Sequence, residues 1–123
     1  MRLLLLIALF CGPLIYAQSP VDVVQEQLEA YNAKDINRFL DVFDDNAVAY
    51  TYGADEPFID GKSAFKTIYS KLFQNSPQLH SKVINRSIIG NTVIDYEQIT
   101  GREGSENILS LVAIYQVKDG KIV

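Results

Sequence analysis

Hydrophobic residues recur at two different periods along this chain, first at helical spacing and later at every second position. Apolar positions three and four residues apart indicate one buried face of a helix. By this criterion the first part of the chain carries helices over residues 20–31, 36–43 and 65–73. Alternation of apolar and polar residues indicates strands. It predicts three long strands, over 79–89, 92–100 and 107–118, and shorter extended segments over 47–52, 58–59 and 121–123.

Polar residues mark the ends of several of these elements. Ser19 precedes Pro20, an arrangement that predicts a side-chain cap followed by proline in the first helical turn. Asp35 is placed to cap the second helix in the same way. Asp119-Gly120 predicts a tight turn before the last strand. Helices followed by an antiparallel sheet make an α+β domain.

The N-terminus has the layout of a secretory signal peptide. Arg2 supplies a positive charge, residues 3–10 form an apolar run, Pro13 interrupts it, and Ala17 provides a small residue at the cleavage position. The run is shorter than the roughly 20 apolar residues that a membrane span needs. We therefore expect a signal peptide over 1–17 and export to the periplasm or the extracellular space, with no membrane attachment after cleavage.

Two alternatives for this leader stay open, an uncleaved anchor and a lipoprotein modified at Cys11. Cleavage after residue 17 leaves one domain over 18–123 that contains no cysteine. Its stability must then come from its hydrophobic core, because no disulfide is present to supplement it.

Charge and composition exclude several classes of function. The net charge of −4 argues against nucleic acid and anionic membranes as partners, because both bind basic surfaces. With one Cys and one His, the chain has neither a disulfide framework nor a Cys/His zinc site. The spacing of its acidic residues matches no calcium-binding loop. We expect no metal and no cofactor.

Several short motifs occur in an order that is more informative than any of them alone. They are Val23-Val24-Gln25, Tyr31-Asn32-Ala33-Lys34-Asp35, Phe43-Asp44-Asp45-Asn46-Ala47, Ile59-Asp60-Gly61-Lys62, Ile99-Thr100-Gly101 and the segment 117–123. With these motifs the chain resembles the nuclear transport factor 2-like (NTF2-like) superfamily, which includes SnoaL-like and ketosteroid-isomerase-like proteins. The resemblance implies a cone-shaped, curved antiparallel sheet wrapped around three helices, a pocket at the open end, and a homodimer formed through the sheet. It leaves the function open, because one fold can host many activities.

The ketosteroid isomerases provide a test at the level of residues. The resemblance implies that their carboxylate base and their two oxyanion-hole groups, a Tyr and a protonated Asp, correspond here to Thr51, Gln27 and Ala113. None of these three has the required group. Tyr69 matches a supporting tyrosine of that family. Steroid isomerisation by that mechanism is therefore not expected.

The resemblance also implies a set of pocket residues. Those with acid–base chemistry are Asp95, Glu97 and His80, the last near the rim. Those that would contact a ligand are Ile99, Leu109, Leu111, Ala113 and Tyr115. The residue type adds Tyr31, Tyr50 and Tyr69, because an apolar ring with a hydroxyl group suits a pocket for a flat, mostly apolar ligand. Strand alternation places Asp95 and Glu97 on one face but does not say which. In the alternative they lie on the solvated convex face, with Ile94 and Tyr96 turned inward.

Two hypotheses about function follow. In the first, the pocket holds a small, largely apolar molecule without turnover. In the second, Asp95 or Glu97, together with His80 and Tyr69, performs acid–base chemistry of isomerase, cyclase or dehydratase type. A purely structural module, with its pocket filled by its own side chains, is a third class. Two neighbouring carboxyl groups that face inward would have at least one raised pKa, because burial and mutual repulsion both oppose ionisation.

Overall fold

The computed structural model describes residues 11–13 and 18–123, so most of the predicted leader lies outside the described residues. In the described part no helix is long and apolar enough to cross a membrane. The helices are α1 (Pro20–Ala33), α2 (Ile36–Asp41) and α3 (Lys62–Asn75). Both predicted caps are confirmed. The Asp22 amide donates to Ser19 Oγ at 3.2 Å, and the Arg38 amide donates to Asp35 Oδ1 at 3.1 Å.

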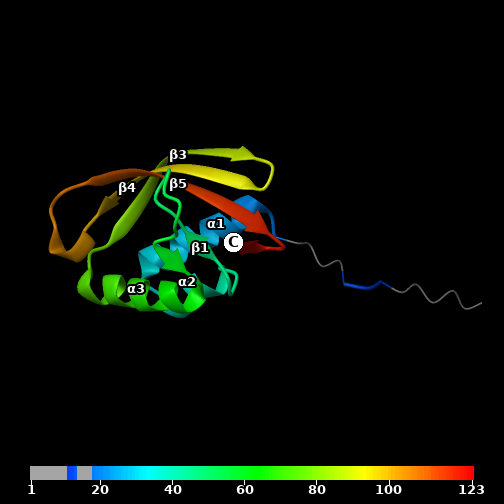
Figure 1. Ribbon diagram of the computed structural model, residues 1–123, viewed down its shortest axis with the longest axis horizontal. Coiled ribbons are helices and arrows are strands. Elements are labelled where there is room, and N and C mark those ends of the chain that lie inside the picture. Colours follow the sequence, from blue (N-terminus) through cyan, green and yellow to red (C-terminus); the bar gives the residue numbers. More distant parts are fainter. Residues whose placement is uncertain (1–10, 14–17) are drawn as a thin grey trace, which may run out of the picture.

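The main sheet is antiparallel, with strand order β3-β4-β5-β6. Its strands are β3 (His80–Ile89), β4 (Thr92–Thr100), β5 (Leu109–Lys118) and β6 (Lys121–Ile122). A short 3-10 helix, η1 (Arg102–Gly104), connects β4 to β5. Figure 1 shows the curved sheet arching over the helices, with α1 beneath it and α3 at the far side. The α+β class and the curved antiparallel sheet are thereby confirmed.

The predicted strand over 47–52 is much shorter in the structure. Only β1 (Val48–Ala49) is extended, and it pairs with β2 (Ile59–Asp60). The chain leaves the pairing because a turn forms at once, with the Ala54 amide donating to the Thr51 carbonyl at 2.9 Å. Tyr52, which lies within the predicted strand, is instead 96% exposed.

An aromatic cluster packs the three helices together. Its members come from all three helices and from the segments that join them: Tyr31, Phe39, Phe43, Phe65, Tyr69 and Phe73. The ring centroids of Phe43 and Phe65 lie 4.5 Å apart, and those of Phe39 and Tyr69 lie 4.6 Å apart. Helical spacing places these rings on the sides of the helices that face one another. Each helix therefore buries one apolar face against its neighbours.

Candidate functional site

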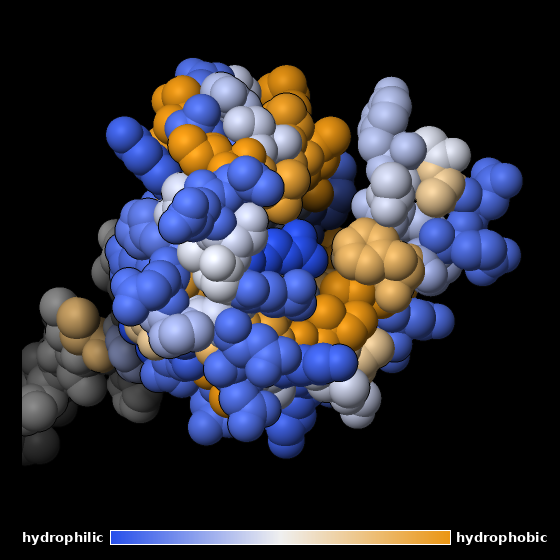
Figure 2. Space-filling model, turned by 90° about the vertical axis from the view of Figure 1, so that its left-hand side faces the viewer, coloured by the Kyte–Doolittle hydropathy of each residue, from blue (hydrophilic) through white to orange (hydrophobic). Residues whose placement is uncertain are grey.

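A cavity of about 840 Å³ lies between the inner face of the sheet, α1, α3 and the loop that follows β1. Seen from the end that carries η1, the surface is hollowed between two lobes, and hydrophobic side chains together with a strongly hydrophilic group border the hollow (Figure 2). Most of the cavity wall is aliphatic or aromatic. Glu97 is the one acidic residue and Arg102 the one basic residue among the described residues that line it.

The two strand carboxylates face inward. Asp95 is 1% exposed and Glu97 is 6% exposed, whereas Tyr96 between them is 37% exposed. Ile99 continues the buried face. The alternative in which Tyr96 faces the core is therefore wrong. Alternation along β4 (residues 92–100) places every second side chain beneath the sheet, as period two requires.

Glu97 lies on the cavity wall with both carboxyl oxygens hydrogen-bonded. Ser81 Oγ donates to Oε2 at 2.8 Å, and the Tyr115 hydroxyl donates to Oε1 at 3.2 Å. Burial raises the pKa of Glu97, the two hydrogen bonds oppose that rise, and the nearby Asp95 charge adds to it. The net direction is upward, so this carboxyl retains its proton to a higher pH than an ordinary glutamate.

Asn32 on α1 fixes the serine that holds this carboxyl. The Ser81 amide donates to Asn32 Oδ1 at 2.8 Å, and Asn32 Nδ2 donates back to the Ser81 carbonyl at 3.0 Å. A side-chain amide thus takes the place of a neighbouring strand at the start of β3. Because both backbone groups of Ser81 are bonded, its hydroxyl is held in position beside Glu97.

Asp95 has a different environment, although it is only two residues away. Arg86 binds it with two hydrogen bonds, from Nε to Oδ1 at 2.7 Å and from Nη2 to Oδ2 at 2.9 Å. Arg86 Nη1 also donates to Gln25 Oε1 on α1 at 2.9 Å. Asp95 is not among the described residues that line the cavity. This two-pronged ion pair ties the sheet to α1 and neutralises one of the two carboxylates.

Most of the predicted ligand-contacting residues meet at the cavity. Six of them line it together with Glu97: Tyr31, Tyr69, Ile99, Leu111, Ala113 and Tyr115. Burial raises the pKa of Tyr31, Tyr69 and Tyr115, so their hydroxyls stay protonated and remain hydrogen-bond donors. Tyr50 also lines the cavity, but it lies at the rim and is 53% exposed.

Besides Asp95, two predicted residues lie outside the cavity lining. His80 is exposed at the start of β3, where it pairs with Thr100, and it is not among the described residues that line the cavity. Leu109 opens β5, is 38% exposed, and is likewise outside the lining set. The structure therefore brings Glu97 together with tyrosines and aliphatic side chains, but not with the histidine.

The sequence analysis did not identify Ser81, Asn32, Arg86 or Arg102 as site residues. The register between β3 and β4 brings Ser81 and Arg86 to the two carboxyl groups, and sequence alternation alone does not determine this register. Gln27 was considered only as a position in the isomerase comparison, yet it is buried in the apolar face of α1 and lines the cavity. A polar residue within an apolar helical stripe is a signal that pattern analysis can detect.

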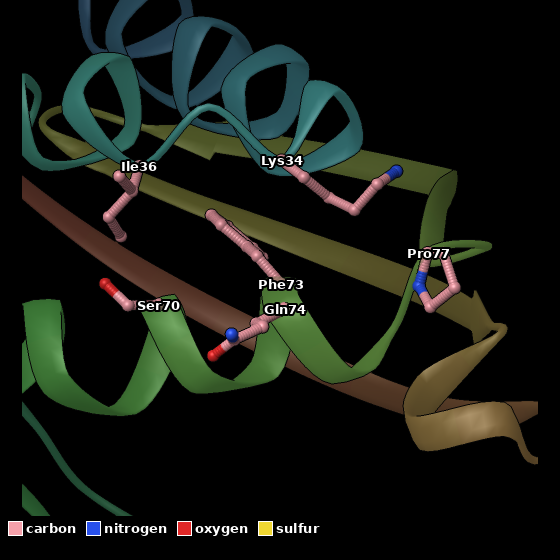
Figure 3. Close-up of a pocket in the computed structure, with 6 residues that line it drawn as sticks. All are labelled: Lys34, Ile36, Ser70, Phe73, Gln74 and Pro77. Carbon is pink, nitrogen blue, oxygen red and sulfur yellow. The ribbon is translucent and has the colours of Figure 1, made fainter.

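A second depression lies on the other side of α3. It is an open groove of about 430 Å³ between α3 and the α1–α2 junction (Figure 3). Phe73 points up into the space between the helices, and Lys34 contributes the one charged group drawn there. The groove contains no acid–base pair. In the described part of the chain no group of three or more His, Cys, Asp and Glu residues gathers to hold a metal ion.

Comparison with known proteins places the chain among related domains. The family model of the SnoaL-like domain matches residues 24–123. A cystatin-fold protein of Novosphingobium aromaticivorans superposes with a TM-score of 0.77 and 23% identity, over 85% of this chain and 93% of that chain. An NTF2-like protein of Cytophaga hutchinsonii gives 0.71 and 16%, over 88% and 87%.

Two further similar structures carry names that describe enzymes. A putative polyketide cyclase from Sinorhizobium meliloti has a TM-score of 0.69 and 19% identity, over 82% of this chain and 88% of that chain. An LEH-like epoxide hydrolase of M. tuberculosis gives 0.72 and 16%, over 84% and 76%. No curated protein matches the chain significantly in sequence. At these identities the similarity shows the shared fold. The match of the SnoaL-like family model confirms the resemblance expected from the sequence motifs.

Proposed function

Because the chain belongs to the SnoaL-like domain family, we propose that its cavity binds a small, largely apolar molecule. The observation that carries this proposal is the cavity itself, whose volume of about 840 Å³ is in the size range of small-molecule sites. Its wall is mainly apolar and has a few polar groups at defined places. Tyr52 and Phe58 on the rim are 96% and 60% exposed, so apolar surface is available to cover a bound molecule.

A fluorescent apolar dye, N-phenyl-1-naphthylamine, tests this proposal. We expect saturable binding to the wild-type protein and its loss in Ala113→Phe, which places a ring in the cavity. Ser110→Phe is the matched control, because Ser110 is an exposed residue of the same strand outside the lining set. Equal binding by both variants would show that the dye does not enter this cavity.

Glu97 supports a second candidate function, acid–base catalysis. It is a buried carboxyl with a raised pKa in an apolar cavity, and groups of this kind serve as general acids and bases in enzymes. A probe is 5-nitrobenzisoxazole. A carboxylate takes the proton from its C3, the C–H electron pair forms the nitrile, and the N–O bond breaks to release a phenolate. We expect Glu97→Gln to abolish this reaction, and a rate unchanged by the substitution would refute a role for Glu97 as the base.

We also propose that the domain is exported after cleavage of residues 1–17. This rests on the charge, apolar run and small residue of the leader. Intact-mass analysis of protein from the native host should give a chain that begins at Gln18. Full-length protein recovered from the cytosol would contradict the proposal.

A homodimer through the outer face of the sheet is proposed as the assembly. Tyr96 pairs with Val112 and Ile94 with Ile114 across β4 and β5, and Val112 and Ile114 are 62% and 54% exposed. Exposed apolar residues that adjoin in this way are typical of interfaces. Light scattering at tens of micromolar should give a dimer mass for the wild type and a monomer mass for Val112→Glu. A monomeric wild type would overturn the proposal.

A further inference from the structure

Arg102 is a cation on the cavity wall without a partner of its own. It lines the cavity, and within the described ranges its guanidinium makes no ion pair and no side-chain hydrogen bond, its neighbour Glu103 included. The other arginines with described side chains are paired, Arg38 with Glu26 and Arg86 with Asp95. Arg102 is exposed where it borders the cavity, so its five N–H donors are available to a bound molecule.

The backbone that carries Arg102 is fixed in position. Gly101 adopts φ +72°, and a Cβ there would collide with the carbonyl of Gln78, so the chain passes directly against the segment that joins α3 to β3. On the other side of Arg102, the Glu103 amide donates to Ser76 Oγ at 2.9 Å, and Ser76 is fully buried. The short helix η1 is thus held at both flanks, and Arg102 is presented to the cavity from a defined place.

The positive charge acts on the groups inside the cavity. It lowers the pKa of the buried Tyr31 and Tyr69 hydroxyls against the larger upward effect of burial. Glu97, the acid of the same wall, forms no ion pair with Arg102; its two oxygens accept from Ser81 and Tyr115. The cavity therefore has an apolar body, a hydrogen-bonded carboxyl inside, and at its edge an exposed cation that forms no ion pair with any described residue.

We propose that Arg102 binds an anionic group of the ligand, so that the molecule recognised is an amphiphilic organic acid with an apolar body. This inference rests on the proposed function of the cavity and specifies its ligand class. The planar guanidinium fork matches the paired oxygens of a carboxylate or sulfonate. The apolar part of the ligand then lies against the tyrosine and aliphatic wall, and its polar end faces Arg102.

Two dyes that differ only in an acidic group test this assignment. N-phenyl-1-naphthylamine is neutral, and 8-anilinonaphthalene-1-sulfonate is the same molecule with one sulfonate added. Fluorescence titrations measure the Kd of each dye for the wild type, Arg102→Gln and Arg102→Lys. Lys71→Gln is the control for the loss of one positive charge, because Lys71 is an exposed residue of α3 outside the lining set.

We expect Arg102→Gln to weaken binding of the sulfonate dye about tenfold and to leave the neutral dye unchanged, since one charge-assisted contact is lost. Arg102→Lys should fall between the two, and Lys71→Gln should match the wild type with both dyes. Salt should weaken the sulfonate dye in the wild type more than in Arg102→Gln. The inference is overturned if the neutral dye binds but Arg102→Gln does not selectively weaken binding of the sulfonate dye. The proposed function would then still stand. Binding of neither dye to the wild type overturns both.

Discussion

The Glu97→Gln substitution should change how the stability of the protein depends on pH. Burial raises the pKa of Glu97 in the folded protein, although Ser81 and Tyr115 both donate to it. In the unfolded chain the same carboxyl is solvated and has its ordinary pKa. The carboxyl group of Glu97 therefore binds its proton more tightly in the folded state than in the unfolded state. The glutamine variant has no titratable group at this position.

The sign of the effect follows from this difference. A group with a raised folded pKa contributes its full stability below the unfolded pKa, and that contribution is lost as pH rises through the folded pKa. Between these two values the wild type should lose stability relative to the variant at up to about 1.4 kcal/mol per pH unit. At low pH the protonated carboxyl and the amide are alike in shape and hydrogen bonding. The two proteins should then differ by only about 1 kcal/mol.

Urea unfolding of both proteins from about pH 4 to about pH 8 gives the measurement, as the difference between their free energies of unfolding at each pH. Titrations shared by both proteins cancel in this difference. Glu106→Gln, in an exposed loop, controls for the removal of one carboxyl from the surface. A difference that is constant across the range, or one in which the wild type gains stability as pH rises, would refute the argument that burial outweighs the two hydrogen bonds.

Three further predictions concern Ser81, the ion pair of Asp95, and the glycines Gly101 and Gly104 at η1. Ser81→Ala should raise the pKa of Glu97, because it removes a hydrogen bond that lowers this pKa. The stability difference between proteins with and without Glu97→Gln, measured when both also carry Ser81→Ala, should then change at higher pH than it does with Ser81. Asp95→Asn should destabilise the protein by about 3–5 kcal/mol in urea unfolding, because it leaves a largely buried guanidinium without its counter-charge; a loss below that of an exposed ion pair would contradict the role of this pair. Gly104→Ala should cost about 1–2 kcal/mol from left-handed strain alone. Gly101→Ala should cost clearly more, because its Cβ also meets a backbone carbonyl, and equal losses would contradict the close approach.

Sequence patterns predicted the elements of the fold well wherever a strong local rule applied. The predicted strand 92–100 coincides with β4, and the caps at Ser19 and Asp35 are present. The prediction was wrong at 47–52, where residues of high β propensity indicated a strand. The turn at Thr51 ends the pairing after two residues. Local propensity was overridden there by the absence of a continuing partner.

The site was predicted only in part, for a related reason. Alternation placed Asp95 and Glu97 on one face, but burial of that face depends on α1 packing beneath the sheet. The partners of the two carboxylates come from distant segments, Ser81 and Arg86 on β3 and Tyr115 on β5. No local period in the sequence reports which residue of one strand lies opposite which residue of another.

A one-residue bulge in β3 gives the two carboxylates their different chemistry. Val83 pairs with Glu97, but after the bulge at Ile84 it is Arg86 that lies opposite Asp95. Without the extra residue, Asn85 would be opposite Asp95 and Arg86 would move to the outer face, because a shift of one residue reverses every side chain. The bulge therefore brings a guanidinium to Asp95 and fixes that carboxylate in an ion pair. Glu97 remains the carboxyl exposed to the cavity, and it is there that proton transfer or ligand recognition can depend on pH.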